Sequence, residues 1–530
     1  MKSGVSTVAA FLAALVSTFA FWWVLGRPVS LPDVSSPKLS CASFAPYLPD
    51  QSPLNPSDVI PPEAIDSDLA LLSPRFGCVR TYAVDQGLHE VPRLAHARGM
   101  KMLLGAWISG NPPLDTMQTD RALALAKAYP DTVRAIVVGN ETLLRGELPA
   151  SRLGEILRDV RRRSPVPVTY ADVWEFWLRN PELARDVDFI TIHILPFWED
   201  EPMSVDDALA HVERILAKVE RAFPDKKILI GEVGWPSAGR MRGPAEPGRV
   251  NQARFIRQFV TLAEARKVDY NLIEALDQPW KRVLEGTVGG YWGLYDVDRN
   301  PKFPLTGPLS EHPHWLLQFA ASAALGIVLL LGAGRPIGWR SCFAALAAGT
   351  IVLLQAEQIG TMAVSAVHWL AGGATLVLST TTAWLLLASP GSSPAPLHHG
   401  FAWARGGFAG ARGGFAGGDA RAVALGGLRG LALFGATMAT LGLAFDPRYR
   451  DFPVAVFLIP ALGFLRFPPS SREAGEMVEE AWLGAVLALA AAAVLVQEGM
   501  DNHQALAWVG VALALAWPGV RAGWLRVRSP

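Results

Sequence analysis

The sequence predicts a closed (β/α)8 barrel of the TIM type joined to an α-helical membrane region, and three observations support this prediction. Eight apolar runs of strand length recur between residues 40 and 280, each followed by residues with helical spacing. Near residue 313 a mixed, charged sequence gives way to long apolar runs. Another apolar stretch precedes the barrel, at residues 8–26. The fold class is therefore α/β, with an all-α polytopic membrane domain after it.

The eight strand-like runs share an apolar body and a polar end. They are ASFAPY, CVRTYA, KMLLGA, AIVVGNE, PVTYA, FITIHILP, ILIGEVGW and NLIEALDQPW. Amphipathic stretches such as VDDALAHVERILAKVERAFP lie between them and should form the outer helical ring. Active sites of such barrels lie at the carboxyl ends of the strands, so the polar ends of these runs are the candidate site.

We expect three parts in the chain. Residues 1–26 predict an N-terminal transmembrane anchor, which is retained because no clear small-x-small cleavage site follows it. Residues 27–313 predict the barrel. Residues 314–530 predict a membrane domain with about seven transmembrane helices. The candidate segments are 314–334, 341–356, 361–388, 422–445, 452–466, 478–497 and 504–521, of which 452–466 is the shortest.

The positions of the arginines favour eight spans in total, with the N-terminus inside. This orientation places most arginine-bearing loops on the cytoplasmic side, as the positive-inside rule requires. These residues are Arg335, Arg340, Arg405, Arg412, Arg421, Arg466, Arg472, Arg521, Arg526 and Arg528, against the contrary pair Arg448 and Arg450. The chain is then a multi-pass protein of the cell (inner) membrane with a periplasmic or otherwise extracytoplasmic barrel. The low-complexity duplication GGFAGARGGFAGG is expected to be a cytoplasmic linker.

Charge and cysteine content exclude several functions. The 48 basic residues equal the 48 acidic residues, and no basic stripe interleaved with aromatics occurs, so we expect no nucleic-acid partner. The three cysteines offer no metal-ligand spacing, and no metal is expected. Cys41 and Cys78 open two consecutive strands. A disulfide in an oxidising compartment and two buried free thiols both remain open for them.

Two glutamates stand at the ends of apolar runs, where an unpaired carboxylate is costly to bury. Glu141 ends the fourth run and Glu232 lies in the seventh. Either residue alone could simply pair with an arginine or cap a helix. Together they could face each other across the barrel mouth. Glycoside hydrolysis needs such a pair, one acid to protonate the leaving oxygen and one carboxylate to attack the anomeric carbon.

With these residues the sequence resembles glycoside hydrolase family 17, the β-1,3-glucanase and β-glucanosyltransferase family, in a bacterial, membrane-anchored type. The resemblance depends on GNE in the fourth run and, above all, on GEVGWPSAG in the seventh. It extends over about residues 40–305 through the motifs SFAPY, VRTY, LLGAWI, EALDQPWK and YWGLYD.

The resemblance implies that Glu141 is the acid/base and Glu232 the nucleophile of a retaining double displacement. A covalent glucosyl-enzyme would form, and no metal or organic cofactor would be required. Gln278 departs from the family pattern, which often has an acid at this position, so a charge-coupling role there is in doubt.

Further strand-end residues are candidates for binding the substrate. The resemblance implies that Asn140 donates to the sugar 2-hydroxyl, and a purely local role in the turn is the alternative. Tyr170 and His193 could hydrogen-bond the sugar or the nucleophile, although satisfied core polar groups are an equal alternative. Tryptophans near strand ends could stack on pyranose rings or serve for packing. The remaining candidates are Tyr82, Trp107, Trp198, Trp235, Trp280 and Lys281.

The sequence thus predicts a retaining enzyme that cleaves β-1,3-glucosidic bonds and transfers glucan to an acceptor, in β-1,3/1,6-glucan remodelling or synthesis. An endo-β-1,3-glucanase that hydrolyses is the first alternative. A non-catalytic glucan-binding domain of a membrane transporter is an alternative of another class. The expected partners are a β-glucan polysaccharide or oligosaccharide, the lipid bilayer, and a separate glucan synthase, because no cytoplasmic domain of sufficient size is present for polymerisation.

Overall fold

The computed structural model describes residues 2–36, 38–334, 338–388, 394–396, 417–469 and 471–528. They divide into two units, Val29–Leu309 and a second one formed by Met1–Pro28 with Ser310–Pro530. The GGFAGARGGFAGG duplication lies outside the described residues up to Ala416. Arg335, Arg405 and Arg412 lie outside them as well.

The first unit is a closed barrel of eight parallel strands that pair in the order of the sequence. This confirms the predicted fold class. The strands are β1 (Leu39–Ser43), β2 (Phe76–Arg80), β3 (Lys101–Ala106), β4 (Val133–Asn140), β5 (Val168–Val173), β6 (Ile190–His193), β7 (Ile228–Val233) and β8 (Asp269–Leu272).

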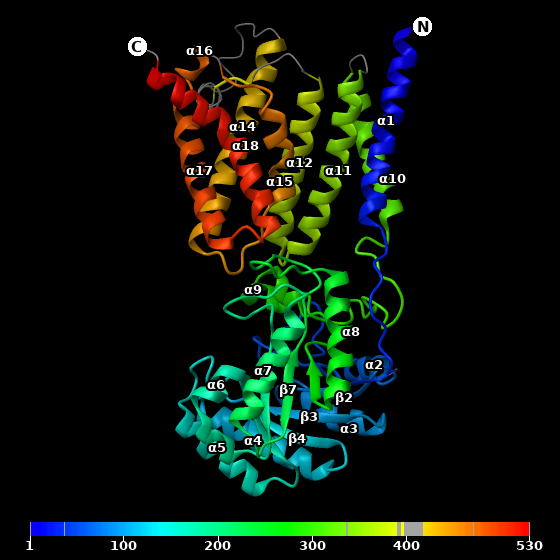
Figure 1. Ribbon diagram of the computed structural model, residues 1–530, viewed down its shortest axis with the longest axis vertical. Coiled ribbons are helices and arrows are strands. Elements are labelled where there is room, and N and C mark those ends of the chain that lie inside the picture. The colour runs from blue at the N-terminus through cyan, green and yellow to red at the C-terminus, as the bar shows by residue number, and fades with distance from the viewer. Residues whose placement is uncertain are drawn as a thin grey trace. The chain divides into compact units, whose positions relative to one another are not determined.

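Helices follow the strands and surround the barrel (Figure 1). The α-helices are α2 (Pro62–Leu72), α3 (Val91–Ala97), α4 (Pro112–Ala128), α5 (Ala150–Arg163), α6 (Trp174–Arg179), α7 (Ala208–Ala222), α8 (Arg249–Arg266) and α9 (Arg282–Glu285). Short 3-10 turns are η1 (Leu88–Glu90), η2 (Pro181–Asp186), η3 (Pro279–Lys281) and η4 (Thr287–Gly290).

Helix α7 illustrates why these segments form the outer ring. Its buried residues recur at helical spacing, so one apolar stripe faces the strands while charged residues face solvent. The buried positions are Ala208, His211, Val212, Ile215, Leu216 and Val219. The basic residue Arg221 lies in its last turn, where it complements the helix dipole.

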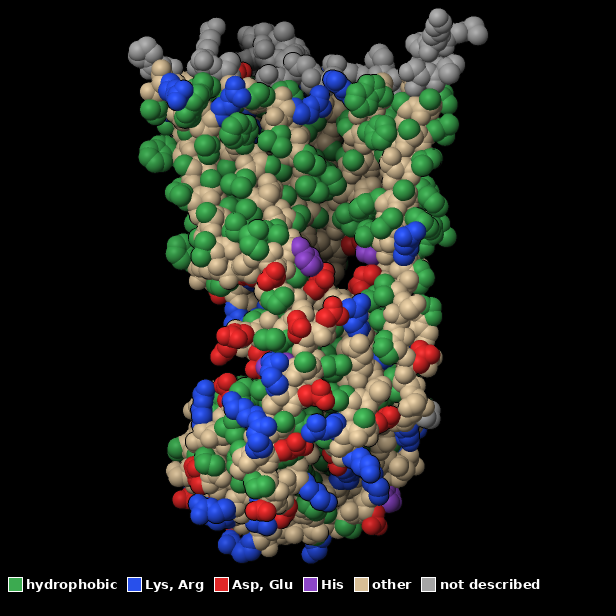
Figure 2. Space-filling model, in the orientation of Figure 1, with side chains coloured by type: hydrophobic (Ala, Val, Ile, Leu, Met, Phe, Trp, Pro, Cys, Tyr) green, Lys and Arg blue, Asp and Glu red, His purple; other side chains and the backbone are tan. Residues whose placement is uncertain are grey.

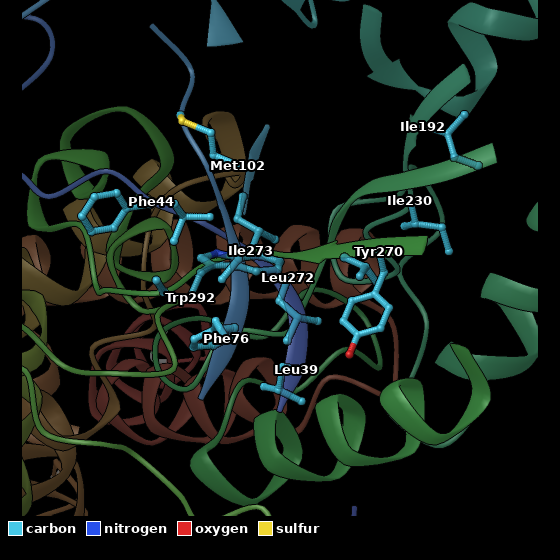
Figure 3. Packing of buried hydrophobic residues seen from close by; sticks show 14 of the residues in the cluster. Leu39, Phe44, Phe76, Met102, Ile192, Ile230, Tyr270, Leu272, Ile273 and Trp292 are labelled. Atoms are coloured by element: carbon cyan, nitrogen blue, oxygen red, sulfur yellow. The ribbon is translucent and has the colours of Figure 1, made fainter. Parts of the chain in front are cut away.

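Alternate strand residues build two separate layers of the core, because successive side chains of a strand point to opposite faces. Small and branched residues fill the inside of the barrel: Cys41, Cys78, Leu103, Ala135, Val137, Ala171 and Leu229. A larger cluster fills the space between strands and helices, and Figure 3 shows 14 of its residues, among them Phe76, Met102 and Tyr270. Residues at the strand ends therefore point either into the mouth or into this outer layer.

The two cysteines of the barrel are joined in a disulfide. Cys41 of β1 is in register with Cys78 of β2, and both side chains are buried inside the barrel. Of the two readings left open by the sequence, the disulfide is the one seen, and free thiols are not. Stable structural disulfides are typical of oxidising compartments.

The second unit is entirely helical. Its helices are α1 (Lys2–Leu25), α10 (Trp315–Gly332), α11 (Trp339–Met362), α12 (Ala366–Ala388), α14 (Gly417–Phe445), α15 (Val454–Phe464), α16 (Ser471–Ala474), α17 (Val478–Glu498) and α18 (His503–Arg528). Within the described residues, seven helices are long and apolar enough to cross a membrane: α1, α10, α11, α12, α14, α17 and α18. Hydrophobic side chains dominate the visible face of this unit, whereas charged side chains are frequent on the visible face of the barrel (Figure 2).

Helix α15, which corresponds to the predicted span 452–466, is shorter than the others. Its 11 residues include Pro460. At 1.5 Å per residue it extends about 17 Å, compared with a hydrocarbon core of about 30 Å. The structure thus offers seven long apolar helices, and the eight-span topology stays a prediction.

Helix α1 packs against α10 in an antiparallel pair. Trp22 is fully buried and donates its indole N–H to Ser322 Oγ at 3.0 Å. Phe19 contacts Trp315 edge to face, and Ala14 is buried in a cluster with Leu330. A segment with these partners packs within the helical unit, and its retention as a membrane anchor stays a prediction.

Candidate active site

Glu141 directly follows the last residue of β4 and has an unusual backbone conformation. Its φ is +54°, in the left-handed region that L-residues other than Gly, Asn and Asp rarely adopt. Its amide donates to Ala171 O of β5 at 2.8 Å, so the residue remains attached to the neighbouring strand. The carboxylate is 22% exposed and reaches solvent at the barrel mouth.

Glu232 lies within β7 and is more deeply buried, with 6% of its side chain exposed. Its Oε1 accepts a hydrogen bond from Tyr82 Oη at 2.9 Å and lies 3.4 Å from Arg80 Nη1. An ionised carboxylate that is buried needs such partners. Both partners come from the second strand and the residues just after it.

His193, the last residue of β6, stands between the two acids. Its Nδ1 shares a hydrogen bond of 2.8 Å with Glu141 Oε1, and its Nε2 lies 3.6 Å from Glu232 Oε1. The ring is completely buried. One carboxylate oxygen each of Glu141 and Glu232 and one ring nitrogen of His193 lie within 4.8 Å of one another. The glutamates predicted from strands four and seven are therefore brought together in space.

The same three atoms could in principle hold a metal ion. A cation at this place would compete with the Arg80 guanidinium, which already neutralises Glu232 at 3.4 Å. Two carboxylates and one imidazole equally fit proton transfer without a metal. The expectation of a metal-free site stays a prediction.

Arg80 is a central residue that sequence reasoning did not assign. It ends β2, is 1% exposed, and donates to Gly231 O at 2.6 Å and to Asn140 Oδ1 at 2.5 Å. A signal was present in VRTY, where a charged residue interrupts an otherwise apolar strand. Only the closed barrel shows that this charge lies beside the strand-seven acid.

The contact with Arg80 fixes the orientation of Asn140. Because Oδ1 accepts from the guanidinium, Nδ2 of the amide must point the other way. In the described part of the chain this nitrogen donates to no protein group, and Asn140 is 8% exposed. A donor next to Glu141 thus has no protein partner among the described residues, and the binding of a sugar hydroxyl by Asn140 stays a prediction.

Two predicted substrate-binding residues lie elsewhere. Tyr170 is 1% exposed and packs on Trp177 in the layer behind β5. Trp235 is completely buried, between Phe197 and Phe255, with its indole N–H on Glu246 O. Side chains without exposed surface cannot stack on or bind a sugar in this arrangement, so we revise both assignments. The same holds for the ring of His193, which is completely buried and hydrogen-bonds Glu141.

The three other predicted tryptophans keep exposed surface. Trp107, Trp198 and Trp280 are half-buried near the ends of β3, β6 and β8. The guanidinium of Arg145 lies over the ring of Trp107, 4.2 Å from its centroid. Trp198 stacks on the buried Trp292. Tyr82 is also half-buried, but its hydroxyl is used by Glu232 and Ser43.

The surroundings of the mouth alter several pKa values. Burial by itself raises the pKa of Glu141, but the hydrogen bond and charge of His193, with the charges of Arg145 and Arg80, lower it below its usual value. Burial and the charge of Glu232 raise the pKa of Tyr82, so this hydroxyl remains a donor. The two acids thus sit in distinct environments, Glu232 beside a hydroxyl and a guanidinium and Glu141 hydrogen-bonded to an imidazole.

Buried charges also follow β8. Lys281, one of the predicted binding residues, donates to both carboxylate oxygens of Glu274 at 2.9 Å. Burial raises the pKa of Glu274 to about 7, against the lowering effect of Lys281. Lys281 is 12% exposed, so its ammonium serves chiefly this pair.

The departure at Gln278 has a structural reason. Its amide nitrogen donates to Ala45 O at 2.6 Å and Leu276 O at 3.2 Å, and its oxygen accepts from the Trp280 indole at 2.8 Å. The side chain is 1% exposed. An ionised acid here would face two carbonyl oxygens that it cannot satisfy.

We therefore expect Gln278→Glu to destabilise the protein by about 1–3 kcal/mol at pH 8, because the buried carboxylate would face two carbonyl oxygens without a donor between them. The loss should shrink at pH 5, because a protonated acid can donate one hydrogen bond again. Thermal denaturation of the full-length protein in detergent at the two pH values measures it. Equal stability of variant and wild type at pH 8 would contradict this account.

A (β/α)8 barrel with two glutamates at the carboxyl ends of β4 and β7, joined through a buried histidine, defines the class of barrel glycoside hydrolases. Comparison with known proteins identifies the family. Residues 41–293 match the BtgE/BtgC glycoside hydrolase domain, and the chain belongs to this family. It is thus a glycoside hydrolase, and the enzyme class predicted from the sequence is confirmed.

Curated relatives agree with this. The chain is 31% identical over 259 residues to a glucan 1,3-β-glucosidase of Arthroderma benhamiae, and this alignment covers 45% of this chain and 82% of the relative. It is 29% identical over 257 residues to a glucan 1,3-β-glucosidase of Schizosaccharomyces pombe, with 45% and 79% covered. A crystal structure of a glycoside hydrolase family 17 β-1,3-glucanosyltransferase from Rhizomucor miehei aligns with a TM-score of 0.43 at 22% identity, over 50% of this chain and 97% of that one.

Proposed function

We propose that this chain is a retaining, β-1,3-glucan-active glycoside hydrolase in which Glu232 is the nucleophile and Glu141 the acid/base. The observation that carries the proposal is the short separation of the two carboxylates, whose nearest oxygens lie within 4.8 Å. Retaining enzymes hold the two groups about 5 Å apart, whereas inverting enzymes need about 6.5–9.5 Å to admit a water molecule.

The roles follow from the surroundings of each acid. Glu232 Oε1 accepts a hydrogen bond from the Tyr82 hydroxyl and forms an ion pair with Arg80. Its other oxygen, Oε2, is therefore the one available to attack the anomeric carbon. As that C–O bond forms, the glycosidic C–O bond breaks and Glu141 gives its proton to the leaving oxygen. In the second half, Glu141 removes a proton from water or a sugar hydroxyl, which displaces Glu232 from the anomeric carbon.

Binding of the reacting sugar falls to neighbouring residues. The amide N–H of Asn140 would donate to the 2-hydroxyl beside the anomeric carbon, and the exposed parts of Trp107 and Trp198 would contact adjacent rings. The substrate class rests on the relatives, which are named glucan 1,3-β-glucosidases. The family 17 motifs of the sequence agree with a β-1,3-linked glucan.

We propose transfer of the glucosyl intermediate to a second glucan, in β-1,3/1,6-glucan remodelling or synthesis, with a separate synthase providing the polymer. Seven long apolar helices hold the enzyme at a membrane, where an exported polymer emerges. The barrel would be extracytoplasmic in a bacterial inner membrane. The Cys41–Cys78 disulfide supports an oxidising compartment. Because α1 and α10 are antiparallel, the two chain segments that connect them to the barrel leave the helix pair at the same end.

The test incubates full-length protein in detergent with reduced laminari-oligosaccharides and follows products by mass and linkage analysis. Products longer than the substrate establish transfer. Exclusively shorter products establish hydrolysis by an endo-glucanase. Unchanged substrate would overturn the enzymatic proposal and favour a glucan-binding domain of a transporter.

A pH prediction follows from the lowered pKa of Glu141. His193→Phe removes the hydrogen bond and charge that lower this pKa while burial, which raises it, remains. A general acid works while protonated, that is below its pKa, so a raised pKa extends activity to higher pH. We expect the alkaline limb of the kcat/KM profile to move upward in His193→Phe, whatever the absolute rate.

Arg145→Gln is the matched control, since Arg145 lowers the pKa of Glu141 only through its charge, with a smaller effect than His193. Its alkaline limb should move in the same direction by less. A downward shift in either variant would show that Glu141 is not the group titrating in this limb.

A further inference from the structure

Two buried polar residues on β5 hold the backbone that follows Glu141. Tyr170 Oη accepts a hydrogen bond from the backbone amide of Leu143 at 3.0 Å, and Asp172 Oδ2 accepts one from the backbone amide of Leu144 at 3.4 Å. Tyr170 in turn donates to Asp172 in a short hydrogen bond. The second carboxylate oxygen of Asp172 accepts from Val173 N at 2.8 Å. Both side chains are at most 1% exposed.

These residues are placed behind the strand and not in the mouth. Ala171 between them belongs to the cluster inside the barrel, whereas Tyr170 belongs to the outer layer and packs on Trp177. Alternation along β5 therefore points Tyr170 and Asp172 away from the substrate. They do not touch the substrate, and they act on the reaction through the turn that they hold and, for Asp172, through its charge near His193 and Glu141.

The segment that they hold needs support. Glu141 has φ +54°, a conformation that costs an L-residue about 1–2 kcal/mol. Gly139, two residues earlier, has φ +81°, and a Cβ there would lie 2.7 Å from Thr142 Oγ1 and 3.3 Å from the Tyr170 ring. The chain thus bends sharply on both sides of Asn140, closely against Tyr170. Such strained backbone persists only where its surroundings fix it.

We propose that Tyr170 and Asp172 are positioning residues that hold the acid Glu141 in its catalytic orientation by accepting hydrogen bonds from the backbone amides of Leu143 and Leu144. The inference rests on the proposed role of Glu141. Three hydrogen bonds from one strand, to Glu141 N, Leu143 N and Leu144 N, define the turn from which the carboxylate projects toward His193. Without them the turn can relax toward an ordinary φ, and the carboxylate leaves the line of the glycosidic oxygen.

The test separates proton donation from general damage by varying the leaving group. Protonation matters for a laminari-oligosaccharide, whose leaving sugar is a poor leaving group, and matters little for a 2,4-dinitrophenyl β-glucoside. In full-length protein in detergent, we expect Asp172→Asn and Tyr170→Phe to lower kcat/KM for the oligosaccharide about 10- to 100-fold, because a misplaced acid loses most of its effect. For the dinitrophenyl substrate, kcat/KM should fall only slightly in the same variants.

Thr169→Val is the matched control. Thr169 lies on the same strand and is fully buried, but its hydroxyl bonds Phe189 O and Thr191 inside the barrel and not the turn after Glu141. Its effect on the two substrates should be equal. Equal losses on both substrates in Asp172→Asn and Tyr170→Phe, or no loss in either, would overturn the positioning role.

Glu141→Ala separates this failure from that of the proposed function. If it lacks leaving-group selectivity, the assignment of Glu141 as the acid fails and the positioning role fails with it. If it shows the selectivity while the β5 variants do not, only the positioning role fails. Should Asp172→Asn not fold, Tyr170→Phe, which removes a single hydroxyl, decides the question.

Discussion

Glu232→Gln should lower the rate of laminari-oligosaccharide cleavage at least about 10³-fold, the largest effect expected of any single substitution in this chain. The amide has the size of the carboxylate and can keep its contact with Tyr82, so packing of the site changes little. It cannot form the ester with the anomeric carbon, because a neutral amide oxygen is a weak nucleophile. Initial rates with reduced laminari-oligosaccharides in full-length protein measure the loss.

Trapping adds a direct readout of this role. A 2-deoxy-2-fluoroglucosyl donor with an activated leaving group should add one sugar to the wild-type protein, and peptide mass analysis should place it on Glu232. Glu220 of α7 forms an exposed ion pair with Arg266 of α8, so Glu220→Gln is the control for the chemistry of the substitution and should behave as wild type. Label on another carboxylate, or activity above a tenth of wild type in Glu232→Gln, would contradict the assignment.

Glu141→Ala is expected to have the second largest effect, a loss of about 10²–10⁴-fold on the oligosaccharide, which is the usual contribution of a general acid. The dinitrophenyl β-glucoside should lose much less in the first step, because its leaving group departs without a proton. The second step then becomes slow, since no base activates water. A burst of dinitrophenol followed by slow turnover is the expected kinetic trace.

Azide provides the control for this variant. As an anion it needs no base, so it should restore turnover in Glu141→Ala and yield a β-glucosyl azide, the product of a double displacement. It should not restore Glu232→Gln, which forms no intermediate. An α-glucosyl azide, or an absence of rescue with unchanged leaving-group dependence, would show that Glu141 is not the acid/base.

Local pattern was sufficient for the parts of the protein that depend on neighbours in sequence. Apolar runs of strand length alternating with amphipathic helices predicted the eight-stranded barrel, because strand and helix periods are properties of short segments. Glu141 and Glu232 were found because each breaks an apolar run. Long apolar segments likewise predicted membrane helices, except that α15 is shorter than its run of sequence indicates.

Residues whose role depends on the closed barrel were beyond this reasoning. Arg80 and Glu232 are 152 positions apart, and only the circular order of the strands brings them to 3.4 Å. Tyr170 was assigned to the sugar because it lies close to a strand end, but the side to which it points depends on the register of β5. The disulfide required that Cys41 and Cys78 be in register on paired strands.

The sequence by itself determined which segments are strands, which are apolar helices, and which two acids stand at strand ends, because periodicity and the cost of burying charge act along the chain. The tertiary structure alone decided which atoms face those acids. Closure of the barrel placed His193 between Glu141 and Glu232, and it brought Arg80 to the position where it orients the amide of Asn140. It also placed Tyr170 and Asp172 behind the turn that carries Glu141. Such contacts join distant strands, so no local pattern encodes them.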